Sequence, residues 1–172
     1  WKLISDSSWR GYTKVPRKIM EGYLIMAAEA AEVFDGIQCT PTHIFLQAGV
    51  GGMAASICAY ARNRWGHKPV IVVVEPTAAP SIVESVKKGE VTRVQGPISN
   101  MGRLDCKEPS LIALEQLANQ VDIFVTIDDH EVSAVLPYLE SRGLETTCSG
   151  AAGLAALMTA NSGRDSLRLT GE

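Results

Sequence analysis

The sequence has no excess of positive charge and no long apolar run. Its 16 lysines and arginines are outnumbered by 19 aspartates and glutamates, which gives a formal net charge of −3. A basic surface for nucleic acid or for an anionic membrane is therefore not expected. No apolar run, residues 70–74 included, approaches the roughly 20 residues that span a bilayer. We expect a protein that has neither nucleic-acid nor membrane partners.

Cysteines at metal-binding or redox spacing are also lacking. No Cys-x-x-Cys pair occurs, and no histidine stands at ligand spacing from a cysteine. This pattern argues against a disulfide framework and against a zinc site, so we expect reduced thiols in a cytoplasmic protein. The four cysteines are Cys39, Cys58, Cys106 and Cys148.

The segment Asp128-Asp-His-Glu131 resembles a metal cluster in composition only. Adjacent residues project in different directions, so the four side chains do not converge on one ion. We expect no metal here. The segment instead predicts the acidic start of a helix that is capped by Asp128 or Asp129.

Short runs of β-branched residues alternate with longer helical patterns along the chain. Continuous apolar strands are typical of a parallel sheet that is covered on both faces. The alternation therefore predicts an α/β fold with three layers, a parallel sheet flanked by helices, in one domain that spans residues 1–172. The expected strands are residues 42–48, 69–74, 91–94 and 122–127. The expected helices are residues 17–34, 52–65, 79–88, 109–118, 130–142 and 149–159.

A glycine-rich segment, Gln47-Ala-Gly-Val-Gly-Gly-Met53, joins a predicted strand to a predicted helix. Gly49, Gly51 and Gly52 allow a sharp turn that exposes successive backbone N–H groups, and the helix dipole adds positive potential. The segment predicts a phosphate site, although a tight turn without a ligand is the alternative. It is neither a Walker loop nor a full Gly-x-Gly-x-x-Gly motif.

Two further segments are candidate parts of a site. Ser149, in Cys148-Ser-Gly-Ala-Ala-Gly153, is a predicted helix N-cap, and the small residues after it suit close packing on a sheet. Asp6, in Asp6-Ser-Ser-Trp-Arg-Gly-Tyr12, places a carboxylate beside Trp9 and Tyr12, where partial burial would tune its pKa for the role of a general base. A capped helix without a ligand and a solvated turn residue are the respective alternatives. Residues 95–108, rich in Gly, Pro and Asn, predict a surface loop.

Three of these segments occur in the order found in one enzyme group. The glycine-rich segment resembles the phosphate loop of fold type II pyridoxal-phosphate enzymes, and Ser149-Gly-Ala-Ala-Gly-Leu154 resembles their later Ser-Gly-Ala-x-Gly segment. Asp6-Ser-Ser-Trp-Arg-Gly-Tyr12 resembles an Asp-Thr-x-Trp-x-Gly-Tyr stretch of the diaminopropionate ammonia-lyase family. Cys148 departs from the pattern, because an acidic residue often precedes Ser-Gly in the family.

The resemblance implies a cofactor, a reaction and roles for single residues. Pyridoxal 5′-phosphate would be held by Gly49, Val50, Gly51, Gly52 and Met53, with Ser149 nearby. Asp6 would act as a base or would recognise the amines of a small amino-acid substrate, 2,3-diaminopropionate, which is converted to pyruvate and ammonia. The alternatives are a threonine or serine dehydratase and a non-catalytic phosphate-binding relative.

The resemblance also implies that this chain is part of a longer enzyme. The Schiff-base lysine of the family lies on a segment that would precede Trp1, and the residue that meets the pyridine nitrogen would follow Glu172. We therefore expect the isolated chain to be inactive and the full-length protein to be a homodimer.

Overall fold

The computed structural model describes residues 4–160 and contains one parallel sheet. Its strands are β1 (His43–Gln47), β2 (Val70–Pro76) and β3 (Ile123–Ile127), in the order β1-β2-β3. His43 pairs with Val70, and Val72 pairs with Ile123. The central strand is rich in valine and isoleucine because it is covered on both faces, and Ile71 to Val74 are fully buried.

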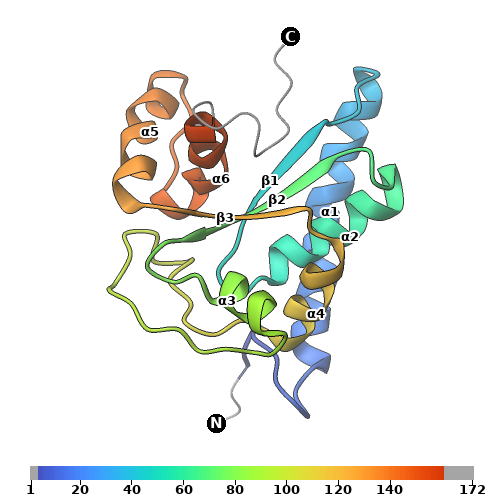
Figure 1. The fold of residues 1–172 in the computed structure, drawn as a ribbon. Coiled ribbons are helices and arrows are strands. Elements are labelled where there is room, and N and C mark those ends of the chain that lie inside the picture. Colours follow the sequence, from blue (N-terminus) through green and yellow to red (C-terminus); the bar gives the residue numbers. More distant parts are fainter. Residues whose placement is uncertain (1–3, 161–172) are drawn as a thin grey trace.

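The helices form a layer on each face of the sheet (Figure 1). Val72 and Val74 point into a core shared with α5 (Asp129–Ser141) and α6 (Cys148–Thr159). Ile71 and Val73 point the opposite way, into a core shared with α2 (Gly52–Trp65) and α4 (Leu111–Gln120). The predicted three-layer α/β fold is confirmed.

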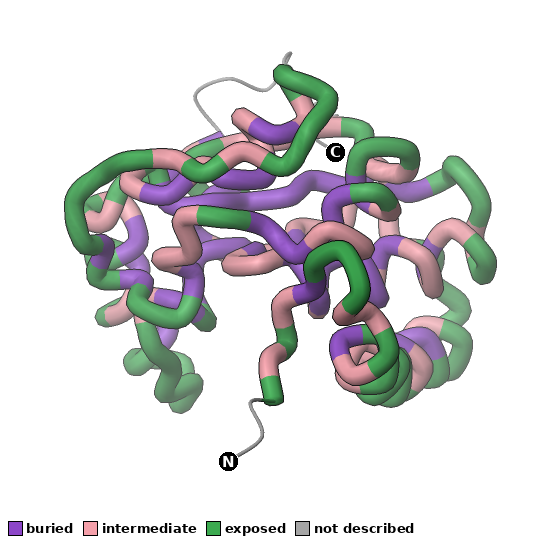
Figure 2. The backbone as a smooth tube through the Cα atoms, turned by 90° about the horizontal axis from the view of Figure 1, so that it is seen from below, coloured by how far each residue is buried: buried purple, intermediate pink, exposed green. Residues whose placement is uncertain are grey.

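Two more helices complete the described chain. The long helix α1 (Lys14–Gly36) packs on α2, and the short helix α3 (Ser81–Lys88) follows β2. In Figure 2 the buried part of the backbone runs through the sheet, and exposed backbone lies around it. Within residues 4–160, no helix has the length and apolar character needed to cross a membrane.

Most predicted elements are confirmed, and their ends shift for local reasons. Helix α2 spans the predicted residues 52–65. Helix α1 begins three residues earlier than predicted, since Pro16 lies in the first turn, where a missing N–H group breaks no helical bond. Helix α4 begins at Leu111 rather than at residue 109, because Ser110 is extended and serves as its N-cap.

The predicted strand at residues 91–94 is wrong. This segment has neither strand nor helix structure. It is held instead by single hydrogen bonds, from the Thr92 N–H to the Ser85 hydroxyl (2.9 Å) and from the Val94 N–H to the Lys107 carbonyl (2.8 Å). The predicted loop at 95–108 is confirmed as a loop, but it is not confined to the surface, because the side chain of Met101 is fully buried.

Candidate active site

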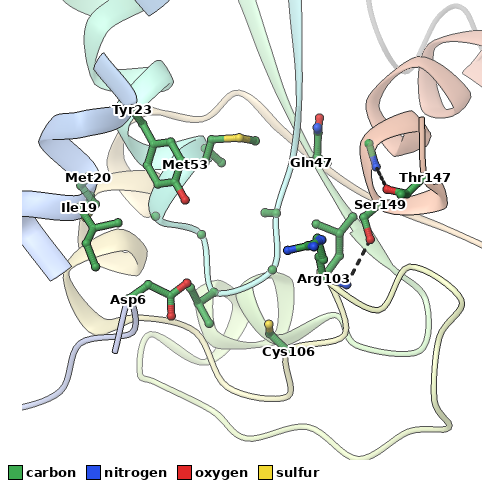
Figure 3. A pocket seen from close by; sticks show the side chains of 18 residues that line it. Asp6, Ile19, Met20, Tyr23, Gln47, Met53, Arg103, Cys106, Thr147 and Ser149 are labelled. Carbon is green, nitrogen blue, oxygen red and sulfur yellow. Dashed lines mark hydrogen bonds between the residues drawn. The ribbon is translucent and has the colours of Figure 1, made fainter. Parts of the chain in front are cut away.

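A cavity of about 300 Å³ lies at the carboxyl end of β1. Its walls come from five parts of the chain: Asp6, three side chains of α1, the glycine loop (residues 49–53) with its flanking residues, and two segments later in the sequence (Figure 3). Crevices at the carboxyl ends of parallel strands are the usual ligand sites of such folds. The α1 side chains are Ile19, Met20 and Tyr23. The two further segments contribute Arg103, Leu104 and Cys106, and Thr147, Ser149 and Gly150.

The conformation of the glycine loop requires glycine at position 51. Gly51 is the N-cap of α2 and has a φ of 95°, in the left-handed region. A Cβ atom on Gly51 would also lie 3.1 Å from side-chain atoms of both Ile82 and Leu117. The first-turn N–H groups of α2 have no partner within the helix and carry the positive end of its dipole. The loop therefore offers an anion a set of backbone donors at the edge of the cavity.

One serine connects the glycine loop to the segment that carries Asp6. The N–H of Ser110 donates to the carbonyl of Val50 (2.9 Å), and its hydroxyl accepts from the N–H of Ser8 (3.0 Å). The hydroxyl of Ser8 in turn accepts from the N–H of Ile112 at the start of α4 (2.9 Å). Asp6, which is exposed, is thereby placed on the side of the glycine loop that faces α1 (Figure 3).

Aromatic stacking shapes the chain just after Asp6. The rings of Trp9 and Tyr12 stack with their centroids 4.4 Å apart. The Tyr12 hydroxyl accepts from the N–H of Ser5 at 3.0 Å. These contacts form a compact turn, and they fix the backbone on both sides of Asp6.

Ser149 lines the cavity, but its prediction as a helix N-cap is wrong. The N-cap of α6 is Thr147, whose hydroxyl accepts from the N–H of Gly150 at 3.2 Å. Ser149 lies within the first turn of the helix, is buried, and accepts from the N–H of Arg103 at 3.1 Å. Two threonines precede Cys148, and the sequence pattern does not show which hydroxyl residue begins the helix. The small residues that follow do pack closely, since a Cβ on Gly153 would lie 3.2 Å from the carbonyl of Phe45 on β1.

The sequence prediction missed Arg103 and Cys106. Burial raises the pKa of the Cys106 thiol, and the nearby carboxylates of Asp6 and Asp105 act in the same direction, so the thiol is neutral at physiological pH. Arg103 and Asp6 are the two lining residues with charged side chains. Both missed residues belong to the loop at 95–108, which has no periodicity that would place its side chains.

The loop at 95–108 is held in place by charged contacts. The Lys107 ammonium donates to the carbonyls of Ala78 and Pro97 (2.8 Å each) and to the carboxylate of Asp105 (2.5 Å). The carboxylate of Asp129 accepts from the hydroxyl of Ser99 at 2.6 Å. These bonds fix the part of the loop that reaches the cavity.

The acidic start of α5 caps the helix, as predicted. Asp128 is the N-cap and forms a capping box with Glu131, whose carboxylate accepts from the N–H of Asp128 at 2.9 Å. Among the residues that the structure describes, no group of three or more His, Cys, Asp or Glu side chains is arranged to hold a metal ion.

Glu75, at the end of β2, faces α3 rather than the cavity. Its buried carboxylate accepts from the N–H groups of Ile82 and Val83, each at 2.8 Å. Burial raises its pKa to about 7, although the hydrogen bonds from Ile82 and Val83 act in the opposite direction. The Glu75 carboxylate therefore binds backbone donors at the start of α3 and is not part of the cavity wall.

Comparisons with known proteins agree on one family. A family model described as "Pyridoxal-phosphate dependent enzyme" matches residues 5–167. Diaminopropionate ammonia-lyase from Escherichia coli strain K12 is 35% identical over 164 residues, which cover 91% of this chain and 41% of the relative. L-threonine ammonia-lyase from Geobacter sulfurreducens is 29% identical over 138 residues, covering 78% of this chain and 34% of the relative. The chain thus spans less than half the length of these relatives.

Solved structures give the same result for the fold. The crystal structure of Escherichia coli diaminopropionate ammonia-lyase with an aminoacrylate-PLP azomethine reaction intermediate has a TM-score of 0.90 and 31% identity, covering 100% of this chain and 47% of that one. The processed form of threonine deaminase isoform 2 from Solanum lycopersicum has a TM-score of 0.76 at 17% identity, covering 90% of this chain and 43% of that one. The second likeness concerns the fold alone.

Proposed function

The chain belongs to the family of pyridoxal-phosphate dependent enzymes, and from this premise we propose that its full-length protein is a diaminopropionate ammonia-lyase. The reaction would convert 2,3-diaminopropionate and water into pyruvate and two molecules of ammonia. The observation that carries the proposal is the carboxylate of Asp6 at the cavity edge, beside the glycine loop, in a chain 35% identical to such an enzyme over most of its length.

The residues of the glycine loop suit the phosphate of the cofactor. The backbone N–H groups of Gly49, Val50, Gly51, Gly52 and Met53 would hold it, since the loop is free of side-chain bulk at three of these positions. When bound, pyridoxal phosphate supplies an electron sink for the carbon that bears the substrate's amino group. Ser149, which fixes the backbone of Arg103, would help to shape the same wall.

Asp6 would act on the substrate. Diaminopropionate carries two amino groups, and a carboxylate at the cavity gives a charged hydrogen-bond acceptor for one of them. The same carboxylate is placed to take a proton as a general base. Both roles require Asp6 to be ionised, and the first has a partner only in a substrate that carries a second amino group.

We also propose that this chain forms most of the larger domain of the enzyme and does not turn over substrate alone. None of the residues that line the cavity within 4–160 is a lysine, so the Schiff-base lysine would come from another segment of the full-length protein. By resemblance to the family, that protein would be a cytoplasmic homodimer.

The test is a coupled assay of the full-length protein with lactate dehydrogenase, which reports the 2-oxo acid product. Diaminopropionate, serine and threonine are compared at equal enzyme and cofactor concentrations. We expect diaminopropionate to give the highest kcat/KM. A preference for threonine or serine would assign the protein to the dehydratases, which the likeness to L-threonine ammonia-lyase makes the second candidate.

A further inference from the structure

We propose that Arg103 is a phosphate-binding residue of this cavity, which pairs its guanidinium with the phosphate monoester held at the glycine loop. The proposal rests on the proposed function to the extent that both need pyridoxal phosphate in this cavity. It adds a charged side chain to a site otherwise built from backbone donors.

The backbone of Arg103 is fixed between two walls of the cavity. Its carbonyl oxygen would lie 2.7 Å from a Cβ atom on Gly49, the first glycine of the loop. Its N–H donates to the hydroxyl of Ser149 at 3.1 Å. Arg103 is therefore held directly against the glycine loop by contacts that do not involve its side chain.

The side chain extends from this point into the cavity, toward the glycine loop (Figure 3). Among the ion pairs of residues 4–160, arginines 62, 64 and 93 each pair with a carboxylate, whereas none of these pairs includes Arg103. The guanidinium is thus available to a ligand. Its planar fork of donors matches a phosphate group, with which it forms two parallel hydrogen bonds.

Arg103 is an exposed residue at the edge of the cavity, and its charge lies on the same side as a second source of positive potential. The first turn of α2 already gives this edge of the cavity positive potential, and a guanidinium beside it adds charge of the same sign. Asp6 lies on the other side of the glycine loop (Figure 3). The cavity therefore has an anion-binding side at Arg103 and a cation-binding side at Asp6, which separates the phosphate from the amino groups of the substrate.

The experiment measures binding rather than activity. The cofactor-free full-length protein is titrated by calorimetry with 4-deoxypyridoxine 5′-phosphate, which lacks the reactive aldehyde, and with 4-deoxypyridoxine, which also lacks the phosphate. The variants are Arg103→Met, Arg103→Lys and the control Arg93→Met. Arg93 is an exposed arginine whose guanidinium lies 4.0 Å from Glu108, and it does not line the cavity.

We expect Arg103→Met to weaken binding of the phosphorylated ligand by roughly 10- to 100-fold and to leave the unphosphorylated ligand unaffected. Arg103→Lys keeps the charge but not the planar fork of donors, so its affinity for the phosphorylated ligand should fall less. The affinity of Arg93→Met should match that of the wild type. Unchanged affinity of Arg103→Met for the phosphorylated ligand would overturn the proposal. So would an equal loss for both ligands, which indicates a damaged cavity.

Two further results separate this proposal from the proposed function. If Arg103→Met binds the phosphorylated ligand normally but raises KM for the amino acid, the guanidinium binds the substrate carboxylate and the phosphate assignment is rejected. If the wild type binds the phosphorylated ligand through Arg103 but forms no 2-oxo acid from diaminopropionate, the lyase assignment fails and the role of Arg103 stands.

Discussion

The carbonyl oxygen of Arg103 packs so closely on Gly49 that a methyl group on this glycine would lie 2.7 Å from it and 3.0 Å from the sulfur of Cys106. The atom nearest to the added methyl group belongs to the backbone, so rotation of a side chain does not relieve the contact. The close contact with Arg103 therefore requires glycine at the first position of the loop.

Gly49→Ala is expected to destabilise the protein by about 1–3 kcal/mol and to weaken cofactor binding, because the glycine loop and residues 103–106 must move apart. Thermal unfolding and a cofactor titration measure the two effects. The control is Gly22→Ala on α1, where a Cβ meets nothing within 4 Å and alanine favours the helix by roughly 0.5–1 kcal/mol. Equal stability of the two variants would contradict the close contact.

Asp6→Asn tests the role of the carboxylate in the proposed reaction. We expect kcat/KM for diaminopropionate to fall by roughly 100-fold or more, as for the loss of a general base, with cofactor binding unchanged. Asp35→Asn is the matched control, since Asp35 is a half-exposed aspartate that pairs with Arg64 at 2.5 Å outside the cavity. A normal kcat/KM in Asp6→Asn would remove Asp6 from the mechanism.

Glu75 predicts a dependence of stability on pH. Its pKa rises from an ordinary value of 4.5 to about 7 in the folded protein, so the folded state binds more protons than the unfolded state between these values. Stability contributed by Glu75 is therefore full below about pH 4.5 and is lost as the pH rises through 7. Glu75→Gln should make the free energy of unfolding depend less on pH in this range, as measured by urea unfolding at pH 5, 6, 7 and 8. An unchanged slope would show that Glu75 is ionised throughout.

Lys107→Met should release the loop at 95–108. Three acceptors lose their ammonium donor, including the mostly buried carboxylate of Asp105, so we expect a loss of about 1–3 kcal/mol and faster proteolysis within the loop. Lys87→Met removes an exposed pair with Glu84 on α3 and should change stability by less than about 1 kcal/mol. Similar proteolysis of both variants would assign the loop's order to its apolar contacts, such as those of Met101.

The sequence predicted best where local chemistry decides the structure. The strand, glycine turn and small apolar helix at 43–65 carry their own start and stop signals, and α2 was predicted to the residue. The cap at Asp128 follows from the same kind of signal. The fold class and part of the cavity, namely the glycine loop, Asp6 and Ser149, were therefore accessible from local patterns and a family resemblance.

The predictions that failed concern segments whose structure depends on contacts with residues far away in the sequence. Residues 91–94 have β-branched residues but no neighbouring strand, and Ser85 and Lys107 take their backbone donors instead. Arg103 reaches the cavity because Ser149, 46 positions further along the chain, holds its N–H. A contact between residues so far apart in the sequence does not produce a periodic pattern in the loop at 95–108.

Ser110 joins two parts of the cavity wall, the glycine loop and the segment that carries Asp6. It bonds through its N–H to Val50 in the glycine loop and through its hydroxyl to Ser8, two residues from Asp6. One short residue thus couples the position of the glycine loop to that of the segment that carries Asp6. A change at Ser110 would therefore shift the proposed phosphate site and the Asp6 carboxylate relative to each other, although Ser110 is not among the residues that line the cavity.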